Sequence, residues 1–469
     1  MTTKNYSATR KSKHNSMKNT NLNGDRVRPI LLSQQEIKTA SEQYGTPLYL
    51  YNLNKIGRQY TKLRDYLPPN FSILYTLKAN SNLTICHTLA QLGCGADISS
   101  TGELKAALKT GFSAPQIVFT GPGKTNSELA AAIEVGIGII VLESVNEARR
   151  LNNLAQKYGK KQDVLIRINP LYRTNQSCEI REKASSCGSD DINSGEPSLK
   201  SQTIASSSSK FGVDENRAIE EIAAIDSLSN LNLKGIHIFT ESNVLDYNQL
   251  LASWTNTISI ANRINDQGYH ISLLDFGGGV GIPYNSIDNE FDVESFGKEL
   301  QRIFENNPYP YHCIVEIGRY MVGEAGCYMS EVVDIKESLG QKFIILDGGV
   351  HQLLRLSMKP ASKYMEVLGR NGNYTQKATL GGKLPTPLDI MVEDVMLPED
   401  IEIGDRLVIY NCGAYGFNHS LTNFSLHNYP AEVAYSDGTI QLIRSSGQVK
   451  DFFVNQKFPT DSEDAKKHI

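Results

Sequence analysis

Lys78 is the residue of this sequence whose surroundings most clearly suggest chemistry. It ends an apolar stretch, in the run YTLKAN. Lysine is rarely buried without a purpose, and an amine in a partly desolvated pocket can form a Schiff base. The alternative is a lysine at the rim of the fold that extends its ammonium group into water. The position therefore predicts either a covalent amine catalyst or an ordinary solvated lysine.

A glycine run and an arginine have the features of an anion site. Gly277, Gly278 and Gly279 follow an apolar stretch in DFGGGVG. Such a run exposes backbone N–H groups and lets an anion approach closely. Arg319 could complete a phosphate site with its fork of donors. It could instead form a plain salt bridge with Glu316, three residues earlier.

Glu316 ends another apolar stretch, HCIVEI. A carboxylate here suits a pyridine nitrogen, because it keeps the ring protonated and electron-withdrawing. A metal site of Glu316 with His312 or Asp275 has no recognisable ligand spacing, so no metal is predicted. An amine, a phosphate cradle, an arginine and a carboxylate together indicate a phosphorylated pyridine.

These groups need a scaffold that brings the ends of distant segments together. Short apolar runs alternate with longer amphipathic ones, and Ser81 or Asn82 can cap the first helix. Eight such alternations predict a closed parallel (β/α)8 barrel, with a doubly wound open sheet as the competitor. The expected strands are 72–76, 95–99, 116–120, 138–143, 163–169, 235–239, 271–276 and 312–317.

Catalytic groups of such a barrel lie just beyond the carboxyl ends of its strands, and phosphate sites use the loops after strands seven and eight. This rule selects candidates without any alignment. They are Lys78, Asp97, Glu103, Arg167, His237, Phe239, Glu241, Ser242, Gly277, Gly278, Gly279, Glu316 and Arg319.

The chain changes character near residue 326, where strand-like runs follow one another without helices. We predict an α/β barrel domain over 55–325 and a β-barrel or β-sandwich domain over 326–455, to which 31–54 contributes. A Ser-rich polar segment at 175–209 is predicted to be a mobile insertion, either a lid or plain disorder. Residues 1–30 form a basic tail expected to be disordered, and 456–469 form a polar tail.

Composition argues against several classes of function. The 469 residues carry a net charge of −4, which gives no electrostatic case for nucleic acid or an acidic membrane surface. No stretch approaches the ~18 apolar residues of a membrane span. The seven cysteines are dispersed without a CxxC pair, as in reduced intracellular proteins. We expect a cytoplasmic protein without a secretory signal.

The ordered motifs resemble those of the fold-type III pyridoxal-phosphate decarboxylases, which include diaminopimelate, ornithine and arginine decarboxylases. The resemblance covers roughly residues 47–443 and implies an alanine-racemase-like fold with pyridoxal 5'-phosphate as cofactor. It is closest to the diaminopimelate decarboxylase-like enzymes of siderophore and antibiotic pathways. The matching stretches are YTLKAN, DISSTGEL, FTGPGKT, SKFG, DFGGGVGIPY, EIGRYMVGEAG, GGVHQLLR, TPLD and GAYGF.

The resemblance implies a role for each matching residue. Lys78 would carry the cofactor as an internal aldimine, and Glu316 would bind the pyridine nitrogen. Arg355, together with Tyr415, would bind the substrate carboxylate. The phosphate would be held by Gly277–Gly279, Arg319 and Tyr415, with Ser242 as an extra donor, and the pocket would be lined by Asp97, Glu103 and Arg167. A head-to-tail homodimer would share its active sites, with residues near GAYGF reaching across.

Two departures from the family pattern bear on mechanism. Phe239 stands where the family usually has a histidine stacked on the cofactor ring, and an aromatic ring can still stack there. Pro385 stands where the family has a cysteine that takes part in reprotonation. Because proline has no proton to give, Cys412 and His351 are candidate replacements, although lone Cys and His residues often simply pack.

The predicted activity is therefore decarboxylation of an amino acid or an amino-acyl intermediate, including one held by a carrier protein. Diaminopimelate decarboxylase of lysine biosynthesis is the first alternative. A catalytically impaired homologue with a binding or regulatory role is the second, since the cysteine is missing.

Overall fold

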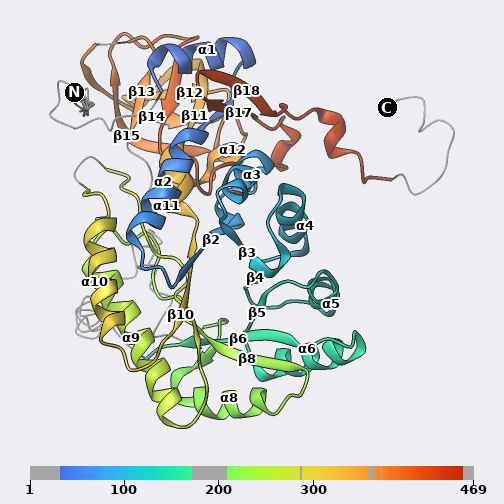
Figure 1. Ribbon diagram of the computed structural model, residues 1–469. Coiled ribbons are helices and arrows are strands. Elements are labelled where there is room, and N and C mark those ends of the chain that lie inside the picture. The colour runs from blue at the N-terminus through green and yellow to red at the C-terminus, as the bar shows by residue number, and fades with distance from the viewer. Residues whose placement is uncertain (1–31, 172–208, 286–287, 359–363, 371, 458–469) are drawn as a thin grey trace, which may run out of the picture.

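Eight parallel strands close into a barrel, as predicted, and the open-sheet alternative is wrong. The computed structural model describes residues 32–171, 209–285, 288–358, 364–370 and 372–457. Barrel strands pair in the order β5-β4-β3-β2-β10-β9-β8-β6, and a β5–β6 pairing closes the ring (Figure 1). They are β2 (Phe71–Thr76), β3 (Gly95–Ile98), β4 (Ile117–Phe119), β5 (Ile139–Leu142), β6 (Gln162–Asn169), β8 (Leu231–His237), β9 (Leu273–Asp275) and β10 (His312–Ile317).

Polar caps begin the helices that follow the strands. The Asn82 side chain accepts the N–H of Thr84 at the start of α3, and Ser100 and Ser144 cap α4 and α6 in the same way. Each cap satisfies an N–H group that has no partner within the helix, which fixes where the loop ends. The helices that pack on the barrel include α2 (Leu53–Tyr66), α3 (Leu83–Gln91), α4 (Thr101–Thr110), α5 (Asn126–Val135), α6 (Val145–Lys157), α8 (Ala218–Asp226), α9 (Tyr247–Asp266), α10 (Val293–Glu305) and α11 (Arg319–Val322).

A second sheet is built from two distant parts of the chain and lies above the barrel in Figure 1. β1 (Leu48–Asn52) pairs antiparallel with β11 (Gly326–Ser338) and parallel with β17 (Ala431–Ser436), so both of its edges are covered. The remaining strands are β12 (Gln341–Leu346), β13 (Met365–Val367), β14 (Tyr374–Gly381), β15 (Ile390–Pro398), β16 (Arg406–Ile409) and β18 (Thr439–Arg444). The sequence did not predict β13 and β14. Helices α1 (Gln34–Tyr44) and α12 (Val350–Leu353) complete this region.

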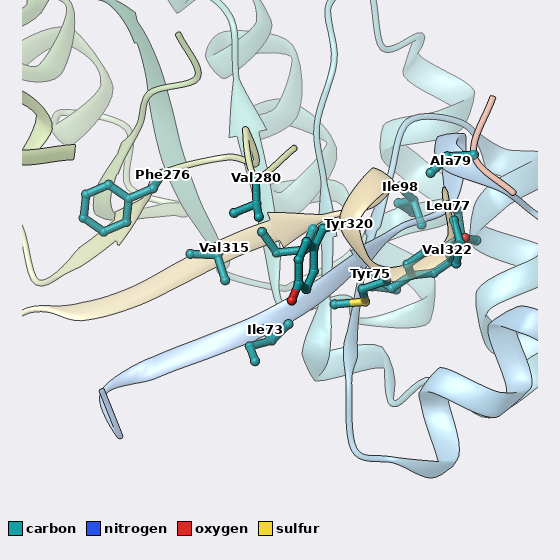
Figure 2. Close-up of a cluster of buried hydrophobic side chains, with 14 of the residues drawn as sticks. Ile73, Tyr75, Leu77, Ala79, Ile98, Phe276, Val280, Val315, Tyr320 and Val322 are labelled. Carbon is teal, nitrogen blue, oxygen red and sulfur yellow. The ribbon is translucent and has the colours of Figure 1, made fainter. Parts of the chain in front are cut away.

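Apolar side chains fill the space between the barrel and its helices. Phe71, Trp254 and Phe276 stack on one another, with ring centroids 4.6–6.1 Å apart. Figure 2 shows further members of this core on β2 and β10, among them Ile73 and Val315. The outward face of each strand is thus anchored by helices.

The inward faces of the strands carry an apolar layer and, above it, a polar layer. Buried Leu74, Leu165 and Ile314 form a separate apolar cluster with Val118 and Val141. Two residues further along the same strands come Thr76, Arg167 and Glu316, which are also buried. Because alternate strand residues share a face, the polar side chains lie directly above the apolar ones. The interior of the barrel is therefore filled by apolar side chains below its polar mouth.

Several predictions fall on parts of the chain that the structure does not describe. The tail at 1–30 lies outside the described residues, and so do the insertion at 175–209 except for Ser209 and most of the tail at 456–469. Among the described residues, no helix is both long and apolar enough to cross a membrane.

Candidate active site

Lys78 lies at the centre of the barrel mouth. It belongs to a short 3-10 turn, Leu77–Ala79, that directly follows β2, and its backbone carbonyl accepts a hydrogen bond from the Asn418 amide at 2.8 Å. Its Nζ lies 5.9 Å from the centre of the Phe239 ring. Burial alone would lower the pKa of Lys78, but the charges of Asp97, Tyr415 and Glu316 raise it. The structure thus holds an ammonium ion among acidic groups.

Three buried titratable groups, which we call the floor cluster, lie on neighbouring strands beneath this mouth. They are His237 at the end of β8, Asp275 at the end of β9 and Glu316 on β10. One ligand-type atom from each lies within 4.8 Å of the others, and His237 Nε2 is 3.6 Å from Glu316 Oε2. Both ring nitrogens of His237, Asp275 Oδ2 and Glu316 Oε1 are buried without a hydrogen-bond partner among the described residues.

The two carboxyl groups of the floor cluster differ electrostatically. Burial and the charge of Glu316 raise the pKa of Asp275 well above its usual range. Burial opposes ionisation of Glu316 too, but His237 and Lys78 lower its pKa below the ordinary value. Asp97, which accepts a hydrogen bond from Thr120 Oγ1 at 2.7 Å, also has a raised pKa because of burial and Glu316.

The glycine loop after β9 can be built only from glycine. Gly277 and Gly279 have φ of 61° and 115°, which side-chain-bearing residues rarely adopt. A Cβ on Gly278 would lie 2.5 Å from the carbonyl oxygen of Glu316. Asp275 Oδ1 accepts the N–H of Gly277 at 2.8 Å and fixes the start of the loop. The N–H groups of Gly278 and Gly279 donate to no described residue, which leaves them available to an anion.

Arg319 joins two tyrosines at the same mouth. Its NH1 donates to the Tyr284 hydroxyl at 2.7 Å, and its guanidinium carbon lies 4.7 Å from the centre of the Tyr415 ring. Within the described residues it forms no ion pair with Glu316, so the salt-bridge alternative is not observed. Tyr415 belongs to the same chain, and its N–H donates to Ala79 at 2.7 Å. The expectation that residues near GAYGF come from a partner is therefore wrong for Tyr415.

Arg355 presents unused donors next to this group. It is 8% exposed, yet its Nε and NH2 atoms are buried with no partner in the described part of the chain. It lies 6.0 Å from the centre of the Tyr284 ring, and burial and Arg319 lower its pKa. Buried guanidinium donors without acceptors fit an anionic ligand.

Arg167 belongs to a second buried set of charges, which we call the paired cluster: Lys124, Glu143, Glu147 and Arg167. Arg167 NH1 pairs with Glu143 Oε1 at 3.2 Å, and Glu143 Oε2 accepts the N–H of Gly212 at 2.5 Å. Glu147 accepts the N–H of Glu143 at 2.9 Å and pairs with Lys124 Nζ at 3.1 Å. Lys124 also donates to the carbonyls of Gly121 and Val141.

Other predicted residues lie less close to the mouth. The Glu103 carboxylate accepts the N–H and hydroxyl of Ser99 at 2.7 and 2.9 Å, so it holds the β3–α4 loop. Ser242 is half-buried in the loop after β8. Cys412 is buried and donates to its neighbour Tyr410, and burial raises its pKa well above normal. His351 is fully buried, with its ring 5.2 Å from that of His427. A proton-donor role for either stays a prediction.

Tyr284 and Asp275 at this mouth were not among the strand-end candidates, and His237 was a candidate without a predicted role. Tyr284 ends the motif DFGGGVGIPY, which was its only sequence signal. His237 and Asp275 stand at strand ends, but only their neighbour relations across β8, β9 and β10 show that they meet Glu316.

The residues present fit pyridoxal phosphate. An amine lies beside an aromatic ring, and a carboxyl oxygen of Glu316 is without a donor among the described residues. The glycine loop has N–H groups that donate to no described residue, and two arginines, Arg319 and Arg355, lie beside Tyr284, which follows that loop in the chain. These are the partners that an aldehyde, a pyridine nitrogen and a phosphate need.

Comparison with known proteins agrees with this geometry. The family model for the pyridoxal binding domain of pyridoxal-dependent decarboxylases matches residues 53–187 and 191–323. The chain is 32% identical to the L-glutamyl-[BtrI acyl-carrier protein] decarboxylase of Niallia circulans, over 91% of this chain and 97% of that protein. It is 31% identical to diaminopimelate decarboxylase of Aquifex aeolicus, over 88% and 92%. The Helicobacter pylori diaminopimelate decarboxylase structure with L-lysine superposes with a TM-score of 0.77 at 27% identity, covering 89% and 98%.

Proposed function

This chain belongs to the family of pyridoxal-dependent decarboxylases, and we propose that it removes the α-carboxylate of an amino-acid-type substrate at the mouth around Lys78. The observation that carries this proposal is the convergence of Lys78, Glu316 and the Gly277–Gly279 loop on one barrel mouth. When bound, pyridoxal phosphate supplies an electron sink for the electron pair left behind by carbon dioxide.

The protein groups would hold and orient the reactants. Lys78 Nζ would attach the cofactor and could also act as a base. Glu316 would keep a proton on the ring nitrogen, and Phe239 would offer an aromatic ring for stacking. The N–H groups of Gly278 and Gly279, with Arg319 and Tyr415, would hold the phosphate, and Ser242 would be an extra donor. Asp97, Glu103 and Arg167 shape the pocket around these groups.

We propose that Arg355 receives an anionic group of the substrate. Its buried Nε and NH2 atoms lack acceptors among the described residues, and a carboxylate would satisfy both at once. The substrate would be an amino acid or an amino-acyl group held by a carrier protein. The Niallia relative, whose name specifies a carrier-protein substrate, supports this choice.

The cofactor test compares two replacements of Lys78. Lys78→Ala removes the amine, whereas Lys78→Arg keeps a cation among the same carboxylates but cannot form the covalent link. We expect the visible absorbance of bound pyridoxal phosphate, and carbon dioxide release, in the wild type alone. A wild type that binds no pyridoxal phosphate would contradict the proposal.

The substrate test offers purified enzyme diaminopimelate, free glutamate and a glutamyl carrier protein in parallel, with carbon dioxide as the readout. We expect the largest kcat/KM with the carrier-bound group. Turnover of diaminopimelate alone would make the enzyme a diaminopimelate decarboxylase. Cofactor binding without turnover of any amino acid would favour a binding or regulatory role.

We also propose a homodimer. Exposed apolar side chains include Leu388, between β14 and β15, which is 76% exposed, and Phe424, in a 3-10 turn between β16 and β17, which is 47% exposed. The proposal rests on the resemblance to the family, and these two exposed side chains are the positions at which we test it. Light scattering should give twice the chain mass, and Leu388→Asp with Phe424→Asp should reduce it. A monomeric wild type would refute the proposal.

A further inference from the structure

The side-by-side burial of Asp275 and Glu316 has no explanation in the backbone alone. Asp275 is 0% and Glu316 is 7% exposed. Asp275 Oδ2 and Glu316 Oε1 are both buried, and neither receives a hydrogen bond from any described residue. One carboxyl oxygen of Asp275 lies within 4.8 Å of one of Glu316. Two buried carboxylates that close would repel one another, so one of them is expected to keep its proton.

The contacts of the other two oxygens show which carboxyl carries that proton. Asp275 Oδ1 accepts the N–H of Gly277 at 2.8 Å, so it acts as an acceptor and leaves Oδ2 to carry a hydrogen. Glu316 Oε2 faces His237 Nε2 at 3.6 Å, so its Oε1 is the oxygen that lacks a donor. A single proton on Asp275 Oδ2, donated to Glu316 Oε1, would give both atoms a partner, and the other lone pairs of the Glu316 carboxylate would stay available to a ring nitrogen.

We propose that Asp275 is a neutral carboxylic acid that donates to Glu316 and holds it as the only carboxylate of the floor cluster. Asp275 is then a positioning residue: it acts on the cofactor through Glu316 and, through Gly277, on the glycine loop. The positioning role of Asp275 in catalysis rests on the proposed function, whereas the assignment of a proton to Asp275 does not. The other charged or titratable groups that face the pair are Lys78 after β2, Asp97 on β3 and His237 on β8.

The electrostatic environment agrees with this assignment. Burial and Glu316 move the pKa of Asp275 upward, while His237 and Lys78 move that of Glu316 downward. A neutral acid beside a carboxylate presents one negative charge to the ring nitrogen and avoids the repulsion of two. The arrangement would also align the Glu316 carboxylate, because the hydrogen bond from Asp275 would fix Oε1 while Oε2 faces His237.

The decisive experiment is infrared difference spectroscopy of the full-length chain at neutral pH, before and after pyridoxal phosphate is added. The wild type minus Asp275→Asn should show the carbonyl band of a protonated carboxyl group and no carboxylate bands. The wild type minus Glu316→Gln should show carboxylate bands. Asp97→Asn is the matched comparison: burial and Glu316 also raise the pKa of Asp97, so this variant identifies the carbonyl band of Asp97 and separates it from the band of Asp275. Carboxylate bands lost in Asp275→Asn would overturn the proposal.

A rescue series tests the positioning role. Asp275→Ala should weaken pyridoxal phosphate binding by about 10- to 100-fold, as expected when a supporting partner is lost. Asn can donate from Nδ2 and accept at Oδ1, so Asp275→Asn should recover most of that affinity. An Asn variant as weak as the Ala variant would contradict the proposal.

Two further outcomes are informative. A stoichiometric divalent metal in the purified chain, removable by a chelator, would replace the proton as the explanation of the unpaired oxygens and overturn the proposal. If the chain binds no pyridoxal phosphate but still shows the protonated Asp275 band, the proposed function fails and the proton assignment stands.

Discussion

The paired cluster and the floor cluster are both buried and charged, yet they differ in how their polar atoms are satisfied. In the paired cluster, Lys124 donates to three acceptors, and both carboxylates receive donors. In the floor cluster, four nitrogen and oxygen atoms lack partners within the described chain. Buried polar groups are almost always paired in proteins. We infer that the paired cluster stabilises the barrel, whereas the floor cluster has polar atoms left over for a ligand.

The largest effect on stability is expected in the paired cluster. Lys124→Met would leave Glu147 buried without its cation and should lower the free energy of unfolding by about 3–5 kcal/mol. Urea denaturation monitored by circular dichroism measures this loss. The matched control is the double variant Lys124→Met/Glu147→Leu, which removes both charges and should recover a large part of the stability. If Lys124→Met were as stable as wild type, the paired cluster would not stabilise the fold and would not differ from the floor cluster in this respect.

An intermediate effect is expected at His351, a buried imidazole outside both clusters. Burial, His427 and Lys383 lower its pKa to about 4, below that of an unfolded histidine. Between pH 6.5 and 4 the unfolded chain binds the extra proton, so stability falls as pH falls. From pH 7 to 5 this residue should contribute a loss of about 1–2 kcal/mol.

His351→Leu tests that loss against its neighbour. The variant should lose less stability than wild type on the same pH change, measured by urea unfolding at both values. His427→Leu, at a half-buried position, should alter the pH dependence less. Equal pH dependence in wild type and His351→Leu would show that the imidazole does not titrate in this way.

The smallest effect on stability is expected at Glu316. Glu316→Gln removes a buried charge that lacks full pairing and keeps the side-chain volume, so the free energy of unfolding should change by less than about 1 kcal/mol. Decarboxylation should nevertheless fall by about 100-fold or more, because the ring nitrogen loses its carboxylate. A strongly destabilised variant would mean that the floor cluster holds the fold, as the paired cluster does.

The sequence predicted the barrel and its mouth because those features are local. Each strand is a short apolar run, and Lys78, Gly277–Gly279 and Glu316 stand at strand ends, where the fold class places catalytic groups. Strand β14 escaped prediction because YTQKATLG is mostly polar along its first half. The floor cluster was not predicted, because His237 and Asp275 are brought next to Glu316 only by the pairing of β8 with β9 and of β9 with β10.

The candidate replacements for Pro385 also depend on distant parts of the chain. Chemical type and nearness to motifs suggest Cys412 and His351. In the structure, Cys412 lies among core residues close to Tyr49 and Tyr328, and His351 is the second residue of α12, which follows a glycine pair. A residue's reactivity depends on its surroundings, which come from strands distant in sequence.

The position of β1 has a consequence for how the chain is made. This strand is synthesised before the barrel, but its two neighbours, β11 and β17, are synthesised after it. Until β11 and β17 emerge from the ribosome, both edges of β1 are unpaired, and the residues that the fold buries are exposed. Unpaired strand edges favour aggregation. The second sheet can therefore be completed only when nearly the whole polypeptide is available. A chain terminated after the barrel would keep β1 as an unpaired, aggregation-prone strand.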